Sequence, residues 1–447
     1  MAPDNLTPTI IPRAEHPISR SSISPGALKV LYRLHNANYR ACLVGGGVRD
    51  LMLGREPKDF DVATDASPDE VRALFRNCRL IGRRFRLAHV RFGNEIVEVA
   101  TFRGSATDAD DANGDDAGRI LRDNTWGTIE EDAVRRDFTV NALFYDIADF
   151  TVHDFVGGIE HLRAGTLQLI GDPGRRYRED PVRMLRAARF AAKLGFRLHP
   201  DTEGPIAELR HLLADIPPAR LFEETLKLFL GGFAVQAYEH LRHLRLFEIL
   251  FPDTEQSLAV EENHFPRTLL LRALEGTDQR VAEGKPVTPP FLFAALLWEP
   301  VRVRAQQLTA EALPELVALQ QATDEVLSRQ LSRVSIPKRF SLPMRDIFML
   351  QARFAMRRGK RPLRLLAHPR FRAAYDFLVL RAAAGEVEQA LADWWTELQE
   401  TDGPGQEILI ESAPADADGG APKRKRRRRR RRKPAGDGDG AGTEAPG

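Results

Sequence analysis

Cysteine is scarce in this chain, and long hydrophobic runs are absent. The 447 residues include two cysteines, Cys42 and Cys78, each in an apolar stretch without metal-ligand neighbours. We therefore expect reduced thiols and a cytoplasmic protein. No segment has the roughly 18 uninterrupted apolar residues of a membrane span, so we expect no membrane partner. The N-terminal residues include prolines and polar side chains but no apolar signal core, so we do not expect export.

Two common phosphate-binding sequences are also missing around the glycine triplet 45–47. No Gly-Lys-Ser/Thr follows it, as in a Walker A loop, and it does not match GxGxxG. The triplet lies between an expected buried strand, 41–44, and an expected short helix, 48–53. Backbone N–H groups of glycine can approach phosphate oxygens closely, and Arg49 adds a positive charge at the helix start. The turn therefore predicts a phosphate site.

The net charge of +2 conceals a strong local excess. Every residue of the run 423–433 is Lys or Arg, and without this run the chain would be acidic. Gly, Ala, Pro and Asp surround it, so we expect 401–447 to be a disordered tail. Basic arms of this kind bind polyanions, most often nucleic acid. A tail for solubility or localisation is the rival interpretation.

Strand and helix patterns divide the chain into two parts. Residues 1–25 are expected to be a flexible lead. Strand patterns then mix with helices, and the runs 86–92 and 95–102 alternate on either side of a Gly-Asn hairpin signal. Residues 104–124 are small and acidic, so we expect a mobile surface loop there. Strand signals become few after residue 182, and helical spacing continues to about residue 398. We expect a mixed α/β head followed by an all-helical body, an α+β fold.

Asp59 and Asp61 are the most informative acidic pair. We expect a strand over 60–63, in which a spacing of two puts both carboxylates on one face. Phe60 and Val62 then point into the core. Hard oxygen ligands on a strand suit Mg²⁺. Together with the glycine turn, the pair predicts a metal–triphosphate site and nucleotidyl transfer.

Residues 131–141 supply a candidate third carboxylate, Asp137. Two-metal phosphoryl chemistry needs several carboxylates to hold both cations. The alternative interpretation is a surface salt-bridge cluster of Arg135, Arg136 and Asp137. The acids at positions 59 and 61 favour the catalytic interpretation.

A third motif begins a helix at Asp180 and Pro181. Arg183, Arg186 and Arg189 recur every three residues on one side of that helix, which is usually a solvated face. Here the row starts beside acids, and a guanidinium with a carboxylate can read a base edge by hydrogen bonds.

Two basic regions favour contact with RNA phosphates. One follows the expected catalytic strand, and the other runs from 338 to 381 with interleaved aromatic residues. Aromatics at helical spacing are more often core than stacking platforms, and we keep that interpretation for most of them. The candidate RNA contacts are Arg83, Arg84, Arg86, Lys338, Arg339, Arg357 and Arg358.

Four motifs in order carry a family resemblance: GGGVRD, DFD, RRDFTVNAL and REDPVRMLRAARFAAKLGF. They resemble the class II template-independent nucleotidyltransferases, the family of bacterial poly(A) polymerases and CCA-adding enzymes. The resemblance implies a polymerase-β-like palm in a head over 26–170. It also implies a helical neck over 171–255 and a helical body over 256–400. The implied reaction transfers a nucleoside monophosphate to an RNA 3′ hydroxyl with two Mg²⁺ ions.

The resemblance also implies roles for individual residues. Asp59 and Asp61 are similar to the metal ligands, and Asp137 to a further catalytic acid. The positions similar to triphosphate or nucleotide contacts are Gly46, Arg49, Arg136, Asn141, Asp180, Arg183 and Arg186.

Residues 216–224, IPPARLFEE, resemble the neck motif of the poly(A) polymerase branch, where CCA-adding enzymes usually carry an ERI-type motif. The leading hypothesis is addition of AMP from ATP to RNA with a free 3′ hydroxyl, in support of mRNA processing and decay. RNA-decay machinery is the implied protein partner. The alternatives are CCA addition to tRNA and an inactive RNA-binding protein.

Overall fold

The fold comes from a computed structural model. The structure describes residues 6–82, 86–104, 126–258 and 269–414. The expected acidic loop at 104–124, apart from Gly104, lies outside these residues, as do Arg83, Arg84 and the basic run 423–433.

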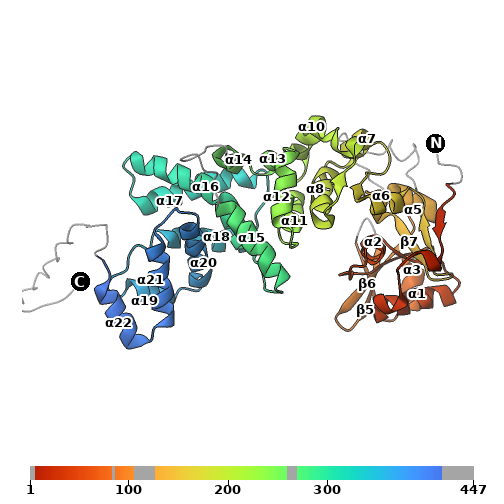
Figure 1. The fold of residues 1–447 in the computed structure, drawn as a ribbon, viewed down its shortest axis with the longest axis horizontal. Helices are drawn as coiled ribbons and strands as arrows, with labels where there is room; N and C mark the ends of the chain where they lie inside the picture. The colour runs from red at the N-terminus through yellow and green to blue at the C-terminus, as the bar shows by residue number, and fades with distance from the viewer. Residues whose placement is uncertain (1–5, 83–85, 105–125, 259–268, 415–447) are drawn as a thin grey trace, which may run out of the picture.

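The molecule is elongated, with a sheet at one end and helices along the rest (Figure 1). The head with its sheet lies on the right of the view. The helices α8, α11 and α12 follow it, and the last helices, α19, α21 and α22, lie at the opposite end. Among the described residues, none of the helices combines the length and apolar character needed to cross a membrane.

The head is built on an eight-stranded mixed sheet in the order β1-β8-β7-β2-β3-β6-β5-β4. β3 and β6 run parallel, and the other neighbours are antiparallel. The strands are β1 (Thr9–Ile11), β2 (Ala41–Val44), β3 (Asp61–Thr64), β4 (Cys78–Ile81), β5 (Leu87–Phe92), β6 (Glu95–Thr101), β7 (Leu143–Asp146) and β8 (Val152–Asp154). The predicted α+β class, mixed sheet and hairpin are confirmed.

The expectation of a flexible lead over 1–25 is wrong for its described part. β1 pairs with β8 at the edge of the sheet, with Thr9 opposite Asp154. Ile18 and Ile23 are 1% and 3% exposed and join the core. The partner strand lies about 140 residues away in sequence, so local pattern gives no sign of the pairing.

Helices cover the sheet and complete the head. Ser67 and Glu70 form a reciprocal capping box at the start of the third helix, as the Ser67-Pro68 start signal predicts. These helices are α1 (Pro25–Asn36), α2 (Gly46–Met52), α3 (Pro68–Leu74), α5 (Ile129–Arg135) and α6 (Gly158–Ala164), with short 3-10 turns at Arg13–Glu15, Arg20–Ser22 and Thr139–Asn141.

The neck follows without a break in the core. β9 (Thr166–Leu167) pairs with β10 (Arg197–Leu198) and thereby joins the end of the head to the end of α8 (Val182–Leu194). Leu185 and Ala188 on α8 are fully buried, as predicted. The other neck helices are α7 (Pro173–Glu179), α9 (Pro200–Glu203), α10 (Ile206–Leu209), α11 (Pro218–Phe229), α12 (Ala234–His243), α13 (Phe247–Leu250) and α14 (Pro252–Leu258), with a 3-10 turn at Arg210–Asp215.

The body is entirely helical within its described residues. Phe348 and Phe354 are fully buried, and Phe371 and Tyr375 are 6% and 8% exposed, so these aromatics are core rather than stacking platforms. The helices are α15 (Leu269–Ala282), α16 (Pro289–Ala310), α17 (Glu315–Leu331), α18 (Lys338–Gln351), α19 (Arg361–Leu366), α20 (Phe371–Ala383), α21 (Gln389–Glu400) and α22 (Gly403–Ser412).

The last of these helices corrects the predicted tail. α22 lies inside the segment 401–447 that was expected to be disordered. Asp402 caps it by accepting from the amide of Gly405, and Ile410 packs into a second core with Trp395 and Leu398. Its glycines and proline stand at the start of the helix, where they are tolerated. The glycine- and proline-rich composition of this segment therefore did not indicate disorder at α22.

Candidate active site

Asp59 and Asp61 lie where β3 starts. The strand begins at Asp61, one residue later than expected, so Asp59 precedes the strand and does not lie within it. Both residues reach solvent, although protein surrounds much of the carboxyl of Asp61. Val62 is fully buried, as predicted. The two carboxylates nevertheless interact, because the charge of Asp59 contributes to a raised pKa of Asp61.

A third acid, Glu98, stands beside this pair and was missed in the sequence. β3 and β6 are parallel, and Asp61 is the register partner of Glu98. Burial of its carboxyl by surrounding protein, followed by the charge of Glu98, raises the pKa of Asp61 to about 6 against the opposing charge of Arg136. Glu98 also lies 3.3 Å from Nε2 of His89 on β5. Adjacent strands therefore bring two carboxylates together.

The glycine turn lies directly against this acidic site. Gly45 has a φ of 70°, which favours glycine, and a Cβ there would lie 3.3 Å from Nη1 of Arg136 and 4.0 Å from Oδ2 of Asp61. The glycine turn therefore lies next to both the DFD and the RRD motifs. The backbone of Gly45, which has no side chain, lies between Asp61 and Arg136. Gly46 follows as the first residue of α2.

Arg49 is buried behind this turn, at 1% exposure. Its Nε and Nη2 donate to Oδ1 of Asp50 at 2.8 and 2.6 Å, and its Nη1 donates to Oδ1 of Asn141 at 2.5 Å. All three nitrogens thus have protein acceptors. These bonds tie α2 to the turn that follows the RRD motif.

Asp137 continues the same network into the neck. Nε of Arg186 donates to its Oδ2 at 2.9 Å, and Nδ2 of Asn141 donates to its Oδ1 at 3.1 Å. The backbone amide of Phe138 also donates to Oδ1. Burial alone would raise the pKa of Asp137. The charge and hydrogen bonds of Arg186, together with the hydrogen bonds from Asn141 and the amide of Phe138, instead hold this pKa below its ordinary value. Asp137 is thus an ionised clamp between head and neck.

Arg136 faces the glycine turn from the other side. Its Nη2 donates to Asp132 at 2.9 Å, and its guanidinium lies 5.0 Å from the ring centre of Phe144. The side chain is 23% exposed, so part of it reaches solvent beside Asp61. Its charge opposes the rise in the pKa of Asp61.

Asp180 and Arg183, two of the expected nucleotide contacts, stand at the start of α8, and each is held by a neighbour. Nη2 of Arg220, on α11, donates to Oδ2 of Asp180 at 2.7 Å. Nη1 of Arg183 donates to Oε2 of Glu179 at 3.0 Å and to the carbonyl of Arg176 at 2.6 Å. The amide of Val182 donates to Oδ1 of Asp180, which fixes the carboxylate at the helix start. Arg220 belongs to the IPPARLFEE motif at 216–224, which resembles the neck motif of the poly(A) polymerase branch.

The acidic residues fit a divalent cation by their chemistry. Hard carboxylate oxygens are the ligands that Mg²⁺ takes. The pKa of Asp61 is raised first by burial and then by the charges of Glu98 and Asp59, and a cation bound nearby would stabilise the ionised carboxylate. Within the part of the chain that the structure describes, no three His, Cys, Asp or Glu side chains are grouped closely enough to form a complete metal site.

Three family models match the chain. They are described as poly A polymerase head domain, over residues 41–168, and probable RNA and SrmB-binding site of polymerase A, over 195–258. The third, over 311–433, is the polymerase A arginine-rich C-terminus. Poly(A) polymerase I of Salmonella typhi is 51% identical over 91% of this chain and 89% of that protein. The chain belongs to the bacterial poly(A) polymerase family.

CCA-adding enzymes are more distant relatives of this poly(A) polymerase family member. That of Bacillus pumilus is 36% identical over 55% of this chain and 59% of that protein. The crystal structure of the Bacillus stearothermophilus CCA-adding enzyme in complex with CTP matches with a TM-score of 0.54 and 26% identity. The match covers 88% of this chain and 89% of that one. The structural match confirms the nucleotidyltransferase fold. The family models and the 51% identical poly(A) polymerase I confirm the predicted poly(A) branch, and the chain is a nucleotidyltransferase enzyme.

The candidate RNA contacts of this poly(A) polymerase that the structure describes lie on three segments of the chain. Lys338 and Arg339 are exposed at the start of α18, with Arg339 stacked 4.7 Å from the ring centre of Phe340. Arg358 donates to the carbonyl of Ala413 at 2.9 Å, and Arg357 lies over Trp394, so both also support the packing of the last helices. Arg86 is exposed and lies 3.3 Å from Asp69.

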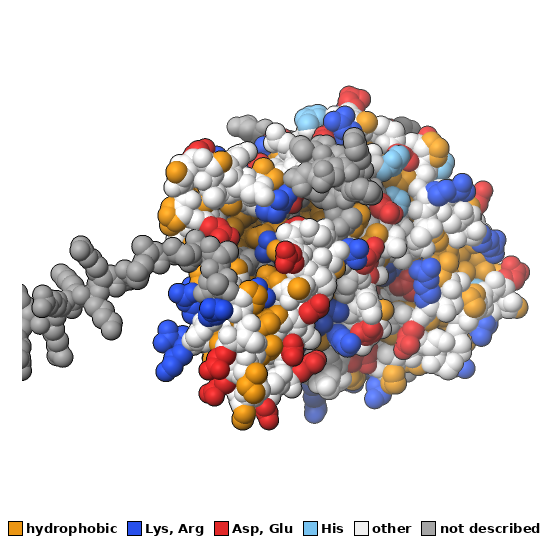
Figure 2. All heavy atoms as spheres, turned by 60° about the vertical axis from the view of Figure 1, so that its left-hand side comes forward, with side chains coloured by type: hydrophobic (Ala, Val, Ile, Leu, Met, Phe, Trp, Pro, Cys, Tyr) orange, Lys and Arg blue, Asp and Glu red, His pale blue; other side chains and the backbone are white. Residues whose placement is uncertain are grey.

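Basic side chains do not form one continuous patch on the face that Figure 2 shows. Lys and Arg alternate there with acidic and hydrophobic groups. Contact of these residues with RNA stays a prediction.

Proposed function

We propose that this chain extends RNA 3′ ends with AMP units from ATP and that its head carboxylates carry the chemistry. The observation that carries this proposal is the meeting of Asp61, Glu98 and the glycine turn at one edge of the β3–β6 pair, beside Arg136. Acidic ligands next to bare backbone and a cation suit a triphosphate and its counterions. The membership of the poly(A) polymerase family supports the same assignment.

Asp59 and Asp61, joined by Glu98, would hold two Mg²⁺ ions. When bound, these ions supply charge that activates the RNA hydroxyl and neutralises the triphosphate. In the reaction, the RNA 3′ oxygen forms a bond to the α-phosphorus, and the bond from that phosphorus to the bridging oxygen of pyrophosphate breaks. Arg136 and the amides of the glycine turn would bind the phosphates while that charge moves.

Asp180 and Arg183 would read the base of the incoming nucleotide. A carboxylate accepts from an exocyclic amine, and a guanidinium donates to the adjacent ring nitrogen, so the pair suits adenine and cytosine and rejects guanine and uracil. The choice between adenine and cytosine would then depend on where the two side chains are held relative to bases of different size. Arg220 and Glu179 hold the two side chains in place. A held pair discriminates better than a mobile one, because a pyrimidine is shorter than a purine and would leave donors or acceptors unpaired unless the two side chains move toward it.

Four hydrogen-bonded residues would hold the glycine turn and the RRD segment in place relative to α8: Arg49, Asn141, Asp137 and Arg186. Their hydrogen bonds run from α2 through the RRD turn to α8. The carboxylate of Asp137 is already engaged on both oxygens, which favours a positioning role over that of a metal ligand. The guanidinium of Arg49 likewise donates to protein acceptors through all three of its nitrogens. We therefore assign Arg49 to support of the glycine turn and not to binding of the triphosphate.

The division into head (26–170), neck (171–255) and body (256–400) would separate chemistry from RNA binding. The neck match described as an RNA and SrmB-binding site supports RNA-decay machinery as a partner class. A cytoplasmic location fits these partners.

Primer extension with labelled RNA, enzyme and Mg²⁺ tests the proposal, with ATP alone, CTP alone or both. A long ladder from ATP alone is the expected result. Short addition that needs CTP, on tRNA without its end, would instead assign CCA addition, the activity of the distant relatives. Tight RNA binding without extension by any nucleotide would assign an inactive RNA-binding protein.

A further inference from the structure

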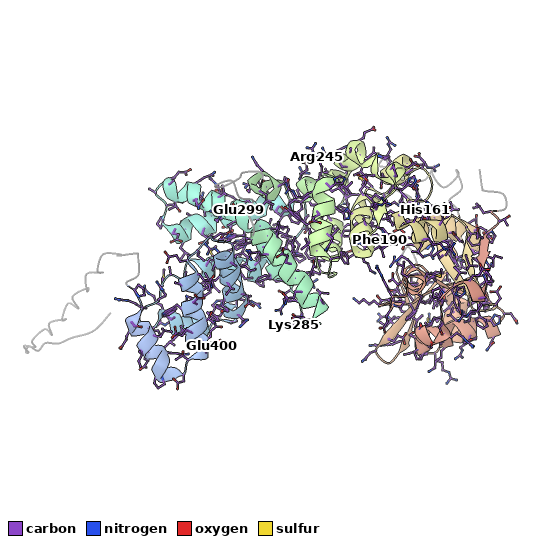
Figure 3. All side chains as sticks on the ribbon, in the orientation of Figure 1. His161, Phe190, Arg245, Lys285, Glu299 and Glu400 are labelled. Atoms are coloured by element: carbon purple, nitrogen blue, oxygen red, sulfur yellow. The ribbon has the colours of Figure 1, made fainter. Side chains whose placement is uncertain are left out.

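A cavity of about 630 Å³ opens on the helical body. Its walls come from α15, α18, α20, the start of α16 and the loop at 286–288 that leads into α16. Lys285, labelled in Figure 3, directly precedes that loop. Leu230 alone of the neck segment 195–258 lines the cavity, and no described residue of the head does. The cavity is therefore separate from the acidic site and from the neck segment whose match is described as an RNA and SrmB-binding site.

The walls of this cavity are mostly apolar, and most of their apolar residues are aliphatic or proline. Ile347 on α18, for example, is 1% exposed. The two apolar rings of the lining are engaged with other rings. Tyr375 packs on Phe371, with 6.0 Å between centroids, and Phe291 packs edge-on against Phe377 at 5.9 Å. Surfaces that bind single-stranded nucleic acid instead offer open rings on which bases stack, so these walls suit apolar side chains of a protein better than nucleobases.

Gly276 stands in the middle of α15 and lines this cavity. A glycine in the interior of a helix lowers the stability of the helix relative to alanine. Neither backbone conformation nor crowding requires a glycine here, because its φ is not positive and a Cβ would meet no atom within 4 Å. The missing side chain leaves the backbone of α15 open to close approach by a ligand.

Four arginines but one acid line the cavity, so the lining carries a positive charge. The arginines are Arg272, Arg280, Arg370 and Arg372, and the acid is Asp376. Arg372 lies 2.9 Å from Asp376, and Arg280 donates to a carbonyl of the loop after α15 at 3.0 Å. Within the part of the chain that the structure describes, the side chains of Arg272 and Arg370 form no hydrogen bond or ion pair. Two exposed guanidinium groups are thus available to an anionic ligand.

We propose that this cavity docks an acidic segment of a partner protein. Apolar side chains of the segment fill the space beside Gly276, and its Asp and Glu side chains pair with Arg272 and Arg370. Charge complementarity selects the segment, because the arginines repel a basic one. A guanidinium pairs with a carboxylate through two parallel hydrogen bonds, and an amphipathic helix in a groove supplies apolar anchors at regular spacing. The inference goes beyond the proposed function, because the cavity contributes no residue to the acidic site.

The test uses the full-length protein and a panel of fluorescein-labelled helical peptides. In these peptides Leu, Ile or Phe recurs at every third or fourth position, and Asp or Glu fills the positions between. A second panel carries Lys in place of each acid. Fluorescence polarisation measures binding to the wild type, to R272E, R370E and G276L, and to the matched control R333E. Arg333 is exposed after α17, has no side-chain partner among the described residues and does not line the cavity.

At least one acidic peptide should bind the wild type, and the Lys panel should not. R272E and R370E should each weaken that binding by about tenfold, because an ion pair is lost and repulsion replaces it. G276L should weaken the binding by at least as much, since the added side chain occupies the docking space. R333E should match the wild type. ATP-dependent primer extension should be unchanged in all four variants.

The proposal is overturned if no acidic peptide binds the wild type, or if G276L binds these peptides as tightly as the wild type does. Weaker binding of an oligoadenylate to R272E and R370E, with no peptide bound, would assign the cavity to RNA and also overturn it. G276L should melt no lower than the wild type, because a Cβ there meets no atom within 4 Å. If G276L does not fold, R272E and R370E decide. A wild-type chain that extends no RNA refutes the proposed function, and peptide binding still judges the cavity.

Discussion

Arg220 and Asp180 form an ion pair, with Nη2 2.7 Å from Oδ2, that links the start of α11 to the turn before α8. We predict that R220Q lowers the preference for ATP over CTP, because it releases the carboxylate that would read the base. A half-exposed ion pair is weak, so the ratio of the two kcat/KM values should fall about fivefold. R245Q, which alters an exposed neck arginine bonded to Glu248, should keep the wild-type ratio. An unchanged ratio in R220Q would show that Arg220 does not support selection.

Glu98 should be as important as the acids of the DxD motif. We predict that E98Q lowers kcat by about a hundredfold or more, since one group arranged around the reacting phosphates is lost. H89Q is the matched control, because it removes the 3.3 Å contact with Glu98 but keeps the carboxylate. Near-normal kcat in E98Q, measured with saturating ATP and RNA, would remove Glu98 from the site.

Asp137 makes a prediction about pH. Folding lowers its pKa, so its contribution to stability is complete above the unfolded-state value of about 4 and disappears as the pH falls through the lower folded-state value. D137N should reduce the free energy of unfolding by about 2 kcal/mol at pH 7. The difference from wild type should shrink between pH 5 and pH 2 in urea denaturation. A difference that stays constant over this range would contradict the ionised clamp.

Local signals made much of the head predictable. The Ser67 cap with Glu70 three residues later, the Gly-Asn turn between alternating runs, and the glycine triplet all act through neighbours in sequence. The DxD pair was also identified, although its strand begins one residue later than expected.

Long-range pairing accounts for what the sequence did not reveal. Glu98 sits on an alternating strand and resembles any solvent-facing acid until β6 pairs in parallel with β3 and places it beside Asp61. β1 likewise depends on a partner, β8, far along the chain. Asp137 resembled a free catalytic acid because the sequence does not show Arg186 closing on it.

The basic run should act through charge alone. We predict that truncation before Ala421 lowers RNA affinity and flattens its dependence on salt concentration, because fewer counterions are then released on binding. Filter binding at several salt concentrations gives the slope. Catalysis on bound RNA should be unchanged, since the motifs of the head and neck remain intact. An equal slope in both proteins would favour a tail for solubility or localisation.

The central claim is that the head carboxylates carry the nucleotidyl transfer. The most direct measurement is ATP-dependent primer extension by the wild type and by the double variant D59A/D61A, with RNA affinity measured on the same preparations. We predict a long ladder for the wild type, none for the variant, and equal RNA binding by both. Extension by a pure, folded double variant would contradict the account.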